Sequence, residues 1–346
     1  MASRRQGPSA TMTLGRTTQT PAGPLRVRHN AASTRSVRWP DGGDPHNTDK
    51  MDAMSDTNKH IVDVLIEERA TRLRRHPMVW AAVRKVFLPI LRHKTAIQMV
   101  DAVQGLTAFD VMDNVVDLLD LDVRIDGLDR VPKEGPVVIL PNHPTGIVDG
   151  ITIYQGLRGY RSDVAFFVNR DAIRAVAALG QMMIPVEWEQ ERRNRSRSKE
   201  TLLAAVRMFQ EARAVVIFPS GRLAYRQGGR LRERPWLSTP LTFARKYNAP
   251  IVPLHINGRN SHMFYFLAAI NEELRDMTLF NEMLNKRGTR FDMTFADPID
   301  PFSLDEDPAE AIGQLQDYVE NDLSAGRDWA ARFPQWRRPA PAPAAD

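Results

Sequence analysis

A histidine and an aspartate lie six positions apart in a polar turn, residues 141–150. The apolar run 136–140 before this turn predicts a buried strand, and residues 151–157 after it are compatible with a helix. His143 and Asp149 can therefore face each other across the turn. A carboxylate that accepts from one imidazole nitrogen leaves the other nitrogen free to take a proton. The pair suits a base that activates a hydroxyl, although a solvated surface histidine would have the same local sequence.

A second polar turn follows the apolar run 215–218 and carries Ser220, Gly221 and Arg222. In open α/β sheets, ligands bind beyond the carboxyl ends of the strands, so His143 and Arg222 would face one crevice if their strands are neighbours. A Ser220 nucleophile assisted by His143 would make a serine hydrolase. The sequence around Ser220 is not Gly-x-Ser-x-Gly, which argues against that function.

A run of basic residues lies just before the helix predicted at 198–212. Guanidinium groups near the amino terminus of a helix favour a phosphate site. An exposed basic loop is the commoner use of such a run, and both interpretations stay open. The arginines of the run are Arg192, Arg193, Arg195 and Arg197.

Short apolar runs alternate with helical periods from residue 121 onwards, which is typical of an α/β sheet. We therefore place an α/β domain at residues 121–335. Helices are expected within it at 171–178, 198–212 and 309–323. The runs expected to form strands are 123–125, 137–140, 164–168, 183–186, 215–218, 251–256 and 291–295.

A helical region precedes this domain, at residues 55–120. His76-Pro77 divides it, because the residue before a proline avoids the helical conformation. A further helix is expected at 101–119. The apolar segment 78–91 carries a basic pair, and it either lies in a membrane interface or packs in the core.

Charge and composition restrict the classes of function. The charged residues of segment 1–40 are seven arginines, so residues 41–346 carry −2 although the net charge is +5. A basic balance confined to one end argues against nucleic-acid binding. Residues 1–54 and 336–346 contain too few large apolar side chains to fold, and we expect disorder there. The first of these segments is a targeting segment or an extension before a later start.

The chain has no cysteine, and its eight histidines are scattered without a ligand-like spacing. We therefore expect no zinc or other metal site. No run of 18 apolar residues occurs in the sequence, so no transmembrane helix is predicted. Any association with a membrane is expected to be peripheral.

Several motifs of this sequence, and the order in which they occur along the chain, resemble those of the glycerolipid acyltransferase superfamily, which includes bacterial 1-acylglycerol-3-phosphate acyltransferase. The resemblance covers residues 120–300. It implies an α/β fold with a mixed sheet flanked by helices, preceded here by the N-terminal helical region. The motifs are Asn142-His143…Asp149-Gly150, Val168-Asn169-Arg170-Asp171, Ile184-Pro185-Val186, Ile217-Phe218-Pro219-Ser220-Gly221-Arg222 and Ile251-Val252-Pro253-Leu254.

The resemblance implies transfer of a fatty acyl group from a thioester, acyl-CoA or acyl-carrier protein, to the hydroxyl of a lyso-lipid or glycerol phosphate. His143 would be the general base, and Asp149 would orient its imidazole. No cofactor is implied beyond this acyl donor. The enzyme would work in the cytoplasm, at the inner face of a membrane. Residues expected to bind substrate are Asn142, Thr145, Gly146, Arg170, Ser220, Gly221 and Arg222.

Two departures from the family pattern concern the acceptor. Five residues, rather than the usual four, separate His143 from Asp149, and we expect Gly146 to absorb the extra residue because glycine adopts positive φ. Ser220 stands where glutamate is usual, and Arg222 where threonine is usual. These changes favour an acceptor such as an amino-acid-containing or otherwise phosphate-free lyso-lipid. The alternative is a non-catalytic lipid-binding protein that keeps the fold.

Two further segments are expected near the substrate. By the resemblance, residues 251–254 would line the acyl or thioester side of the site. Pro250 and Pro253 limit hydrogen bonding within a sheet, so an opening or bulge is expected beside this strand. We expect the aromatic run 263–267 to pack in the core, to cap an acyl pocket or to touch lipid.

Overall fold

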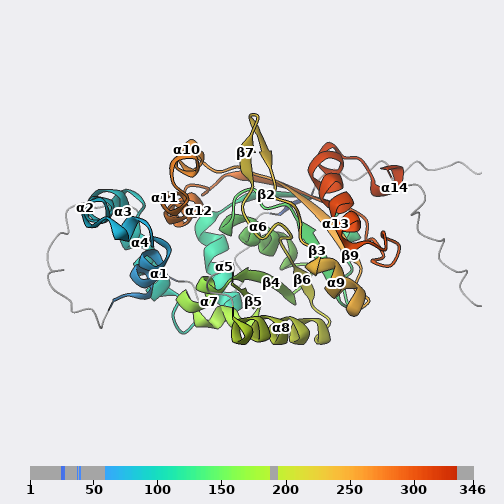
Figure 1. Ribbon diagram of the computed structural model, residues 1–346. Coiled ribbons are helices and arrows are strands. Elements are labelled where there is room, and N and C mark those ends of the chain that lie inside the picture. Colours follow the sequence, from blue (N-terminus) through green and yellow to red (C-terminus); the bar gives the residue numbers. More distant parts are fainter. Residues whose placement is uncertain (1–24, 28–36, 38, 40–58, 188–193, 333–346) are drawn as a thin grey trace, which may run out of the picture.

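The computed structural model describes residues 25–27, 37, 39, 59–187 and 194–332. Within these ranges the centre of the protein is an eight-stranded sheet with the order β1-β2-β10-β9-β3-β6-β4-β5 (Figure 1). Its strands are Leu25–Val27 (β1), Asp122–Asp126 (β2), Val137–Pro141 (β3), Val164–Asn169 (β4), Met183–Val186 (β5), Ala214–Val216 (β6), Ile251–Asn257 (β9) and Arg290–Phe295 (β10).

The sheet is mixed, as the sequence predicts. Neighbouring strands are parallel from β9 through β3, β6 and β4 to β5. Strand β10 is antiparallel to β9 and parallel to β2. All seven strands expected from the apolar runs are present, with bounds that differ by one or two residues. The carboxyl ends of β3 and β6 are adjacent, so the two polar turns lie side by side.

Helices cover both faces of the sheet, since successive side chains of its central strands point to opposite faces. Val137 and Ile139 of β3 join one core, which includes α5 and α6. Val138 and Leu140 join the other, which includes α8, α9 and α13. The helices of these layers are Ala108–Leu119 (α5), Ile147–Leu157 (α6), Arg170–Ala175 (α7), Arg195–Gln210 (α8), Thr239–Lys246 (α9), Pro308–Asp317 (α13) and Trp329–Arg332 (α14).

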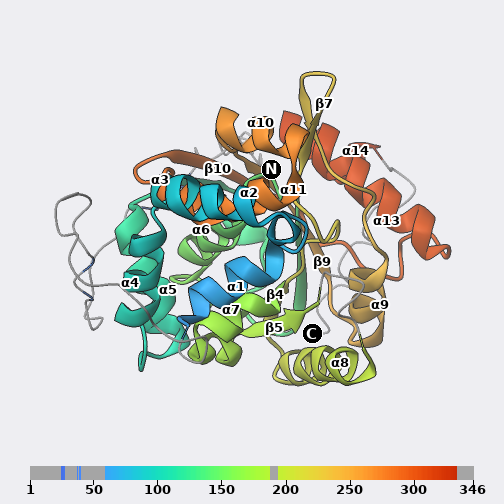
Figure 2. The ribbon, with the colours of Figure 1, turned by 60° about the vertical axis from the view of Figure 1, so that its left-hand side comes forward.

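A second helical layer lies beside the sheet domain, where Figures 1 and 2 show the N-terminal helices next to α10 and α11. A small apolar core joins them: Leu73 and Leu88 on one side pack with Met263, Leu274 and Met277 on the other. These helices are Ile61–Arg69 (α1), Pro77–Ala82 (α2), Leu88–Ile90 (α3), His93–Ala102 (α4), His262–Ile270 (α10), Glu272–Met277 (α11) and Leu279–Leu284 (α12).

Crossing a bilayer demands a long apolar helix, and none occurs in the part of the chain that the structure describes. The segment 78–91 is divided between α2, a π-helical turn at Val83–Phe87, and α3. Helix α2 begins at Pro77, as expected from the His76-Pro77 pair.

Two expectations for the first 120 residues are wrong in part. Residues 101–119 do not form one helix, because Gly105 adopts φ +78° and Thr107 caps a new helix, α5. Within the segment 1–54, where disorder is expected, Leu25–Val27 forms a strand antiparallel to β2, whose edge offers free backbone groups. Apart from Val37 and Trp39, the rest of this segment lies outside the described residues, as does the tail 336–346.

Arg161 holds together the amino-terminal ends of the central strands. Its buried guanidinium donates to the carbonyls of Pro132, Gly135 and Ala212 at 2.7–3.1 Å. It also makes an ion pair with Asp163 at 2.7 Å. These contacts fix the starts of β3, β4 and β6 at the edge of the sheet opposite the two polar turns.

Arg161→Ala should lower the free energy of unfolding by about 3 kcal/mol, because three carbonyls lose a donor and each buried unsatisfied acceptor costs about 1–3 kcal/mol. Urea unfolding followed by circular dichroism measures the change. Arg207→Ala, on the exposed face of α8, is the matched control and should stay within about 0.5 kcal/mol of the wild type. Equal losses in the two variants would contradict this role of Arg161.

Candidate active site

The turn between β3 and α6 brings His143 and Asp149 together. Its last residue, Gly146, has φ +94° and ψ −120°, a conformation that residues with a Cβ rarely adopt. Helix α6 begins at the next residue, and Asp149 is its third residue. The extra residue of this turn is therefore absorbed at Gly146, as expected from the sequence.

Asp149 is fully buried, and both of its carboxylate oxygens accept hydrogen bonds. Oδ2 accepts from the Nδ1 of His143 and from the backbone N–H groups of Thr145 and Gly146, each at 2.9 Å. Oδ1 accepts from the hydroxyl of Thr145. Four donors on one carboxylate compensate the cost of burying its charge.

The imidazole of His143 is held by two side chains and is 18% exposed. Nδ1 donates to Asp149, since an ionised carboxylate can only accept. The ring stacks on Phe218, with centroids 4.0 Å apart. Within the described ranges, Nε2 has no hydrogen-bond partner. This arrangement leaves the lone pair of Nε2 available to take a proton.

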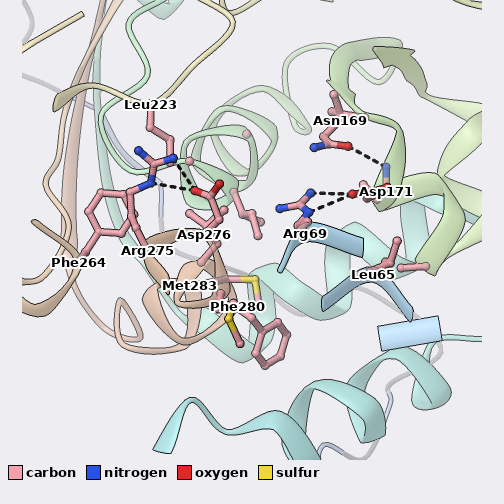
Figure 3. A pocket seen from close by; sticks show the side chains of 18 of the residues that line it. Leu65, Arg69, Asn169, Asp171, Leu223, Phe264, Arg275, Asp276, Phe280 and Met283 are labelled. Atoms are coloured by element: carbon pink, nitrogen blue, oxygen red, sulfur yellow. Dashed lines mark hydrogen bonds and ion pairs between the residues drawn. The ribbon is translucent and has the colours of Figure 1, made fainter. Parts of the chain in front are cut away.

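His143 lies in the wall of a cavity of about 1180 Å³, between the sheet domain and the N-terminal helices. Gly146, Gly221 and Arg222 line the same region of the cavity as His143, so the two polar turns meet here. Most of the remaining wall is apolar, and Figure 3 shows part of it. Apolar lining residues include Leu65, Met99, Val103, Phe167, Phe264, Phe280 and Met283.

Most arginines of the cavity wall are neutralised. Arg69 pairs with Asp171 at 2.8 Å and Arg275 with Asp276 at 2.7 Å, as Figure 3 shows. Two lining arginines make no ion pair or hydrogen bond with any residue in the described part of the chain: Arg226, whose guanidinium lies over the ring of Tyr265, and Arg222. Arg222 is exposed at the cavity, close in sequence to Gly221. Arg222 is therefore available to an anionic group.

The expected substrate-binding residues of the first turn divide into two groups. Gly146 lines the cavity. Thr145 is buried beneath it and contacts Asp149. Asn142 faces away from the large cavity, because its amide pairs with both backbone groups of Ile256 at 2.7 and 3.0 Å. Asn142 and Thr145 thus hold the turn in place.

The second turn places Ser220 outside the cavity lining. Its hydroxyl donates to the carbonyl of Arg222 at 2.8 Å, which closes the turn. Arg170 also lies outside the lining and pairs with Glu200 at 2.7 Å. The geometry therefore brings Gly221 and Arg222 to His143, but neither Ser220 nor Arg170.

The basic run before α8 is only partly described. Arg192 and Arg193 lie outside the described residues. Arg195 begins α8, and Arg197 pairs with Glu187 at 2.5 Å. Neither lines the large cavity. Phosphate contact by this run stays a prediction.

The strand at 251–254 does not line the cavity, contrary to expectation. Its residues belong to β9, which is central in the sheet between β3 and β10. Pro253 is accommodated there because its carbonyl still accepts from Ala296 at 2.9 Å. The aromatic run packs in the core through Phe264, which is fully buried, and Phe264 and Tyr265 also line the cavity.

One buried acid beside the first turn was not anticipated from the sequence. Glu233 accepts a hydrogen bond from the backbone N–H of His143 and another, at 2.8 Å, from the indole of Trp236. Burial raises the pKa of the Glu233 carboxyl to about 7. It follows a hairpin, Tyr225–Gln227 (β7) and Arg230–Arg232 (β8), which projects from the molecule in Figures 1 and 2. The acid lies 90 residues from His143, so no local spacing indicates the contact.

Gly146→Ala should break the bond between His143 and Asp149. The new Cβ would lie 2.9 Å from Leu223, and the backbone strain costs about 1–3 kcal/mol. We expect the low-field Nδ1–H resonance of His143 to move in the proton NMR spectrum and the melting temperature to fall. Gly135→Ala is the control, since Gly135 also has positive φ but open space around it. It should lower stability and leave that resonance in place.

Comparison with known proteins identifies the family of this chain. The model of the family described as Acyltransferase matches residues 122–257. The chain is 30% identical over 219 residues to a lyso-glycine lipid O-acyltransferase of Phocaeicola vulgatus, covering 61% of this chain and 76% of that protein. A protein of the same name from Bacteroides thetaiotaomicron is 28% identical over 219 residues, covering 61% and 78%.

Among solved structures, the crystal structure of the 1-acyl-sn-glycerophosphate (LPA) acyltransferase PlsC from Thermotoga maritima aligns with a TM-score of 0.42 and 14% identity. The alignment covers 77% of this chain and 96% of PlsC. The family match and the two relatives show that the chain belongs to the acyltransferase superfamily and is a lipid O-acyltransferase of the lysophospholipid and glycerolipid type.

Proposed function

We propose that His143 is the general base of an acyl transfer from a thioester donor to the hydroxyl of a lyso-lipid. The observation that carries the proposal is the His143–Asp149 pair in the wall of a large apolar cavity. A buried carboxylate fixes the tautomer that leaves Nε2 unprotonated and stabilises the imidazolium that forms. The cavity offers an apolar environment for a fatty acyl chain beside this base.

The proton and bonds balance without an acyl-enzyme. The acceptor oxygen attacks the thioester carbon while Nε2 of His143 takes the hydroxyl proton. The tetrahedral intermediate then breaks its carbon–sulfur bond, and the imidazolium returns the proton to the departing thiolate. The products are an ester and a free thiol. Backbone N–H groups of the strand-end turns would stabilise the oxyanion between these steps.

We propose further that the acceptor is an amino-acid-containing lyso-lipid such as a lyso-glycine lipid. The printed names of the two relatives support this class. Arg222 also supports it, because a guanidinium without a carboxylate partner within the described ranges suits a carboxylate in a headgroup. The donor is acyl-CoA or acyl-carrier protein, and the site needs no other cofactor.

His143→Ala and Asp149→Asn should each lower turnover about 10²–10⁴-fold, the usual contribution of a general base. The assay supplies labelled acyl-CoA with a synthetic lyso-glycine lipid or lysophosphatidic acid, and mass spectrometry identifies the products. The lyso-glycine lipid should be the better acceptor. His60→Ala is the matched control, because His60 forms a surface pair with Asp101 at 3.0 Å and does not line the cavity.

Wild-type turnover in folded His143→Ala protein would disprove the assignment of the base. Ser220→Ala tests the alternative that the protein is a serine hydrolase. Because the hydroxyl of Ser220 is already bonded to the carbonyl of Arg222, we expect this variant to keep most of its activity. A loss equal to that of His143→Ala, together with a trapped acyl-serine, would support the hydrolase instead. A wild-type protein that binds lyso-lipid and forms no ester would be the non-catalytic lipid-binding protein.

We also propose that the outer faces of α2, α3 and α10 contact a lipid surface. These helices lie near one another in Figures 1 and 2. Met78 of α2 is 87% exposed and Ile270 of α10 is 62% exposed, and neither lines the cavity. Exposed Arg84 and Lys85 lie between the apolar residues of the N-terminal group. Apolar side chains bordered by basic ones suit the interface of an anionic bilayer.

A triple variant, Met78→Ser, Val86→Ser and Ile90→Ser, should weaken binding to phosphatidylglycerol vesicles at least about tenfold, since each large apolar side chain contributes free energy when it leaves water. Vesicle sedimentation measures the partition coefficient. The control is Leu202→Ser with Leu203→Ser, because these exposed residues belong to α8, which lies well apart from α2, α3 and α10 in Figure 1. An equal loss in the control would contradict a specific membrane-facing surface.

A further inference from the structure

Glu233 is a buried acid that touches the main chain of the proposed base. It is 8% exposed, and its Oε1 accepts from the backbone N–H of His143. Its Oε2 accepts from the indole Nε1–H of Trp236 at 2.8 Å. Both oxygens are therefore used as acceptors, one of them on the residue that carries the imidazole.

The segment that carries Glu233 joins the two polar turns. At its start, the backbone N–H of Ala224 donates to the carbonyl of His143 at 2.9 Å. At its end, the N–H of Leu237 donates to the carbonyl of Pro219 at 3.0 Å, in the second turn. The N–H of Trp236 donates to Gln316 of α13 at 2.9 Å. The segment thus ties both turns to a rigid helix on the far face of the sheet.

We propose that Glu233 is a positioning residue for the acyl transfer, which it supports by holding the backbone of His143 in register with Asp149 and with the second turn. Because it acts through His143, this inference rests on the proposed function. Glu233 does not line the large cavity, so it does not touch the substrate there.

The protonation state of Glu233 decides whether this carboxyl can hold the backbone of His143. An ionised carboxylate accepts both N–H groups, whereas a protonated one has an O–H that would face a donor. Burial raises the pKa of Glu233 to about 7, so the change falls within the working range of many enzymes. The support is therefore complete well above pH 7, half present near pH 7 and lost as the pH falls further.

A second cavity, of about 340 Å³, gives this carboxyl a polar surrounding. Arg230 and Arg232 of β8, His255 of β9 and Glu320 of the helical turn Tyr318–Asp322 line it with Glu233. Burial lowers the pKa of His255 to about 4, so this histidine is neutral where Glu233 titrates. Glu320 opposes ionisation of Glu233, and His143 favours it.

Three variants test the inference. Glu233→Gln removes the titration and presents an amide NH2 to the indole N–H or to the N–H of His143, so one donor always meets another. Adding Trp236→Phe removes the indole donor, and the amide oxygen can then accept from His143 alone. Glu320→Gln is the matched control: it removes an acid from the same cavity and leaves the His143 turn untouched.

We expect Glu233→Gln to lower kcat about 10–10²-fold, as small misplacements of a catalytic group do, with KM nearly unchanged. Glu233→Gln with Trp236→Phe should recover much of that loss. For the wild type, log(kcat/KM) should fall more steeply than one decade per pH unit on the acid side, because protonation of Glu233 adds a step that the double variant lacks. The double variant should fall by one decade per unit. Glu320→Gln should keep the wild-type kcat and the steep acid limb, with that limb moved to lower pH because Glu320 opposes ionisation of Glu233. The probes are acyl-CoA and a synthetic lyso-glycine lipid.

Several results would overturn the inference. A Glu233→Gln protein with wild-type kcat and acid limb would show that the contact is incidental. A rise in KM with kcat unchanged would show a role other than positioning His143. A double variant that does not recover kcat would show the same. If Glu233→Gln fails to fold, the pH profile of the wild type decides. A fall of log(kcat/KM) by only one decade per pH unit on the acid side would show that protonation of Glu233 does not affect activity. His143→Ala separates this inference from the proposed function: activity in that variant refutes the base, whereas an inactive His143→Ala with an unaffected Glu233→Gln refutes only Glu233.

Discussion

The buried carboxylate of Asp149 is the interaction on which the site depends. A charge removed from water is tolerated only when its hydrogen-bonding capacity is met. Here the donors are the imidazole of His143, the hydroxyl of Thr145 and two backbone N–H groups of the turn. The same contacts begin α6, since the amino-terminal N–H of Gly146 is capped by the third residue of that helix. The carboxylate of Asp149 thus both caps α6 and aligns the imidazole of His143.

The sheet topology explains why the second turn can reach the first. Strands β3 and β6 are parallel neighbours, so both end at the same edge. The stacking of His143 on Phe218 joins the turns through side chains, and the segment 224–237 joins them through the backbone. The N-terminal helices then close the other side, where a small apolar core binds them to α10 and α11. The cavity is a consequence of this second layer.

Local patterns predicted the sheet well because its strands are buried on both faces and read as continuous apolar runs. They also predicted the His143–Asp149 pair and the use of Gly146, which lie within seven consecutive positions. The prolines predicted an opening or bulge beside β9, and residues His255–Asn257 of this strand do line the second cavity. Residues 251–254 are nevertheless central in the sheet, since a proline can lie in a central strand when its carbonyl keeps a partner. Glu233 and the supporting role of Asn142 depend on contacts across 90 and 114 residues, which no local pattern encodes.

Both departures from the usual family motifs are compensated within their own turns. The longer first turn is absorbed by the positive φ of Gly146, and the imidazole still meets Asp149 at 2.9 Å. In the second turn, the hydroxyl of Ser220 donates to the carbonyl of Arg222, a bond that an ionised carboxylate at this position would be unable to make. The backbone of the site is therefore self-supporting without the usual glutamate. What changes is the chemistry that the turn presents, because Arg222 remains free of a carboxylate partner among the described residues and faces the cavity next to the base.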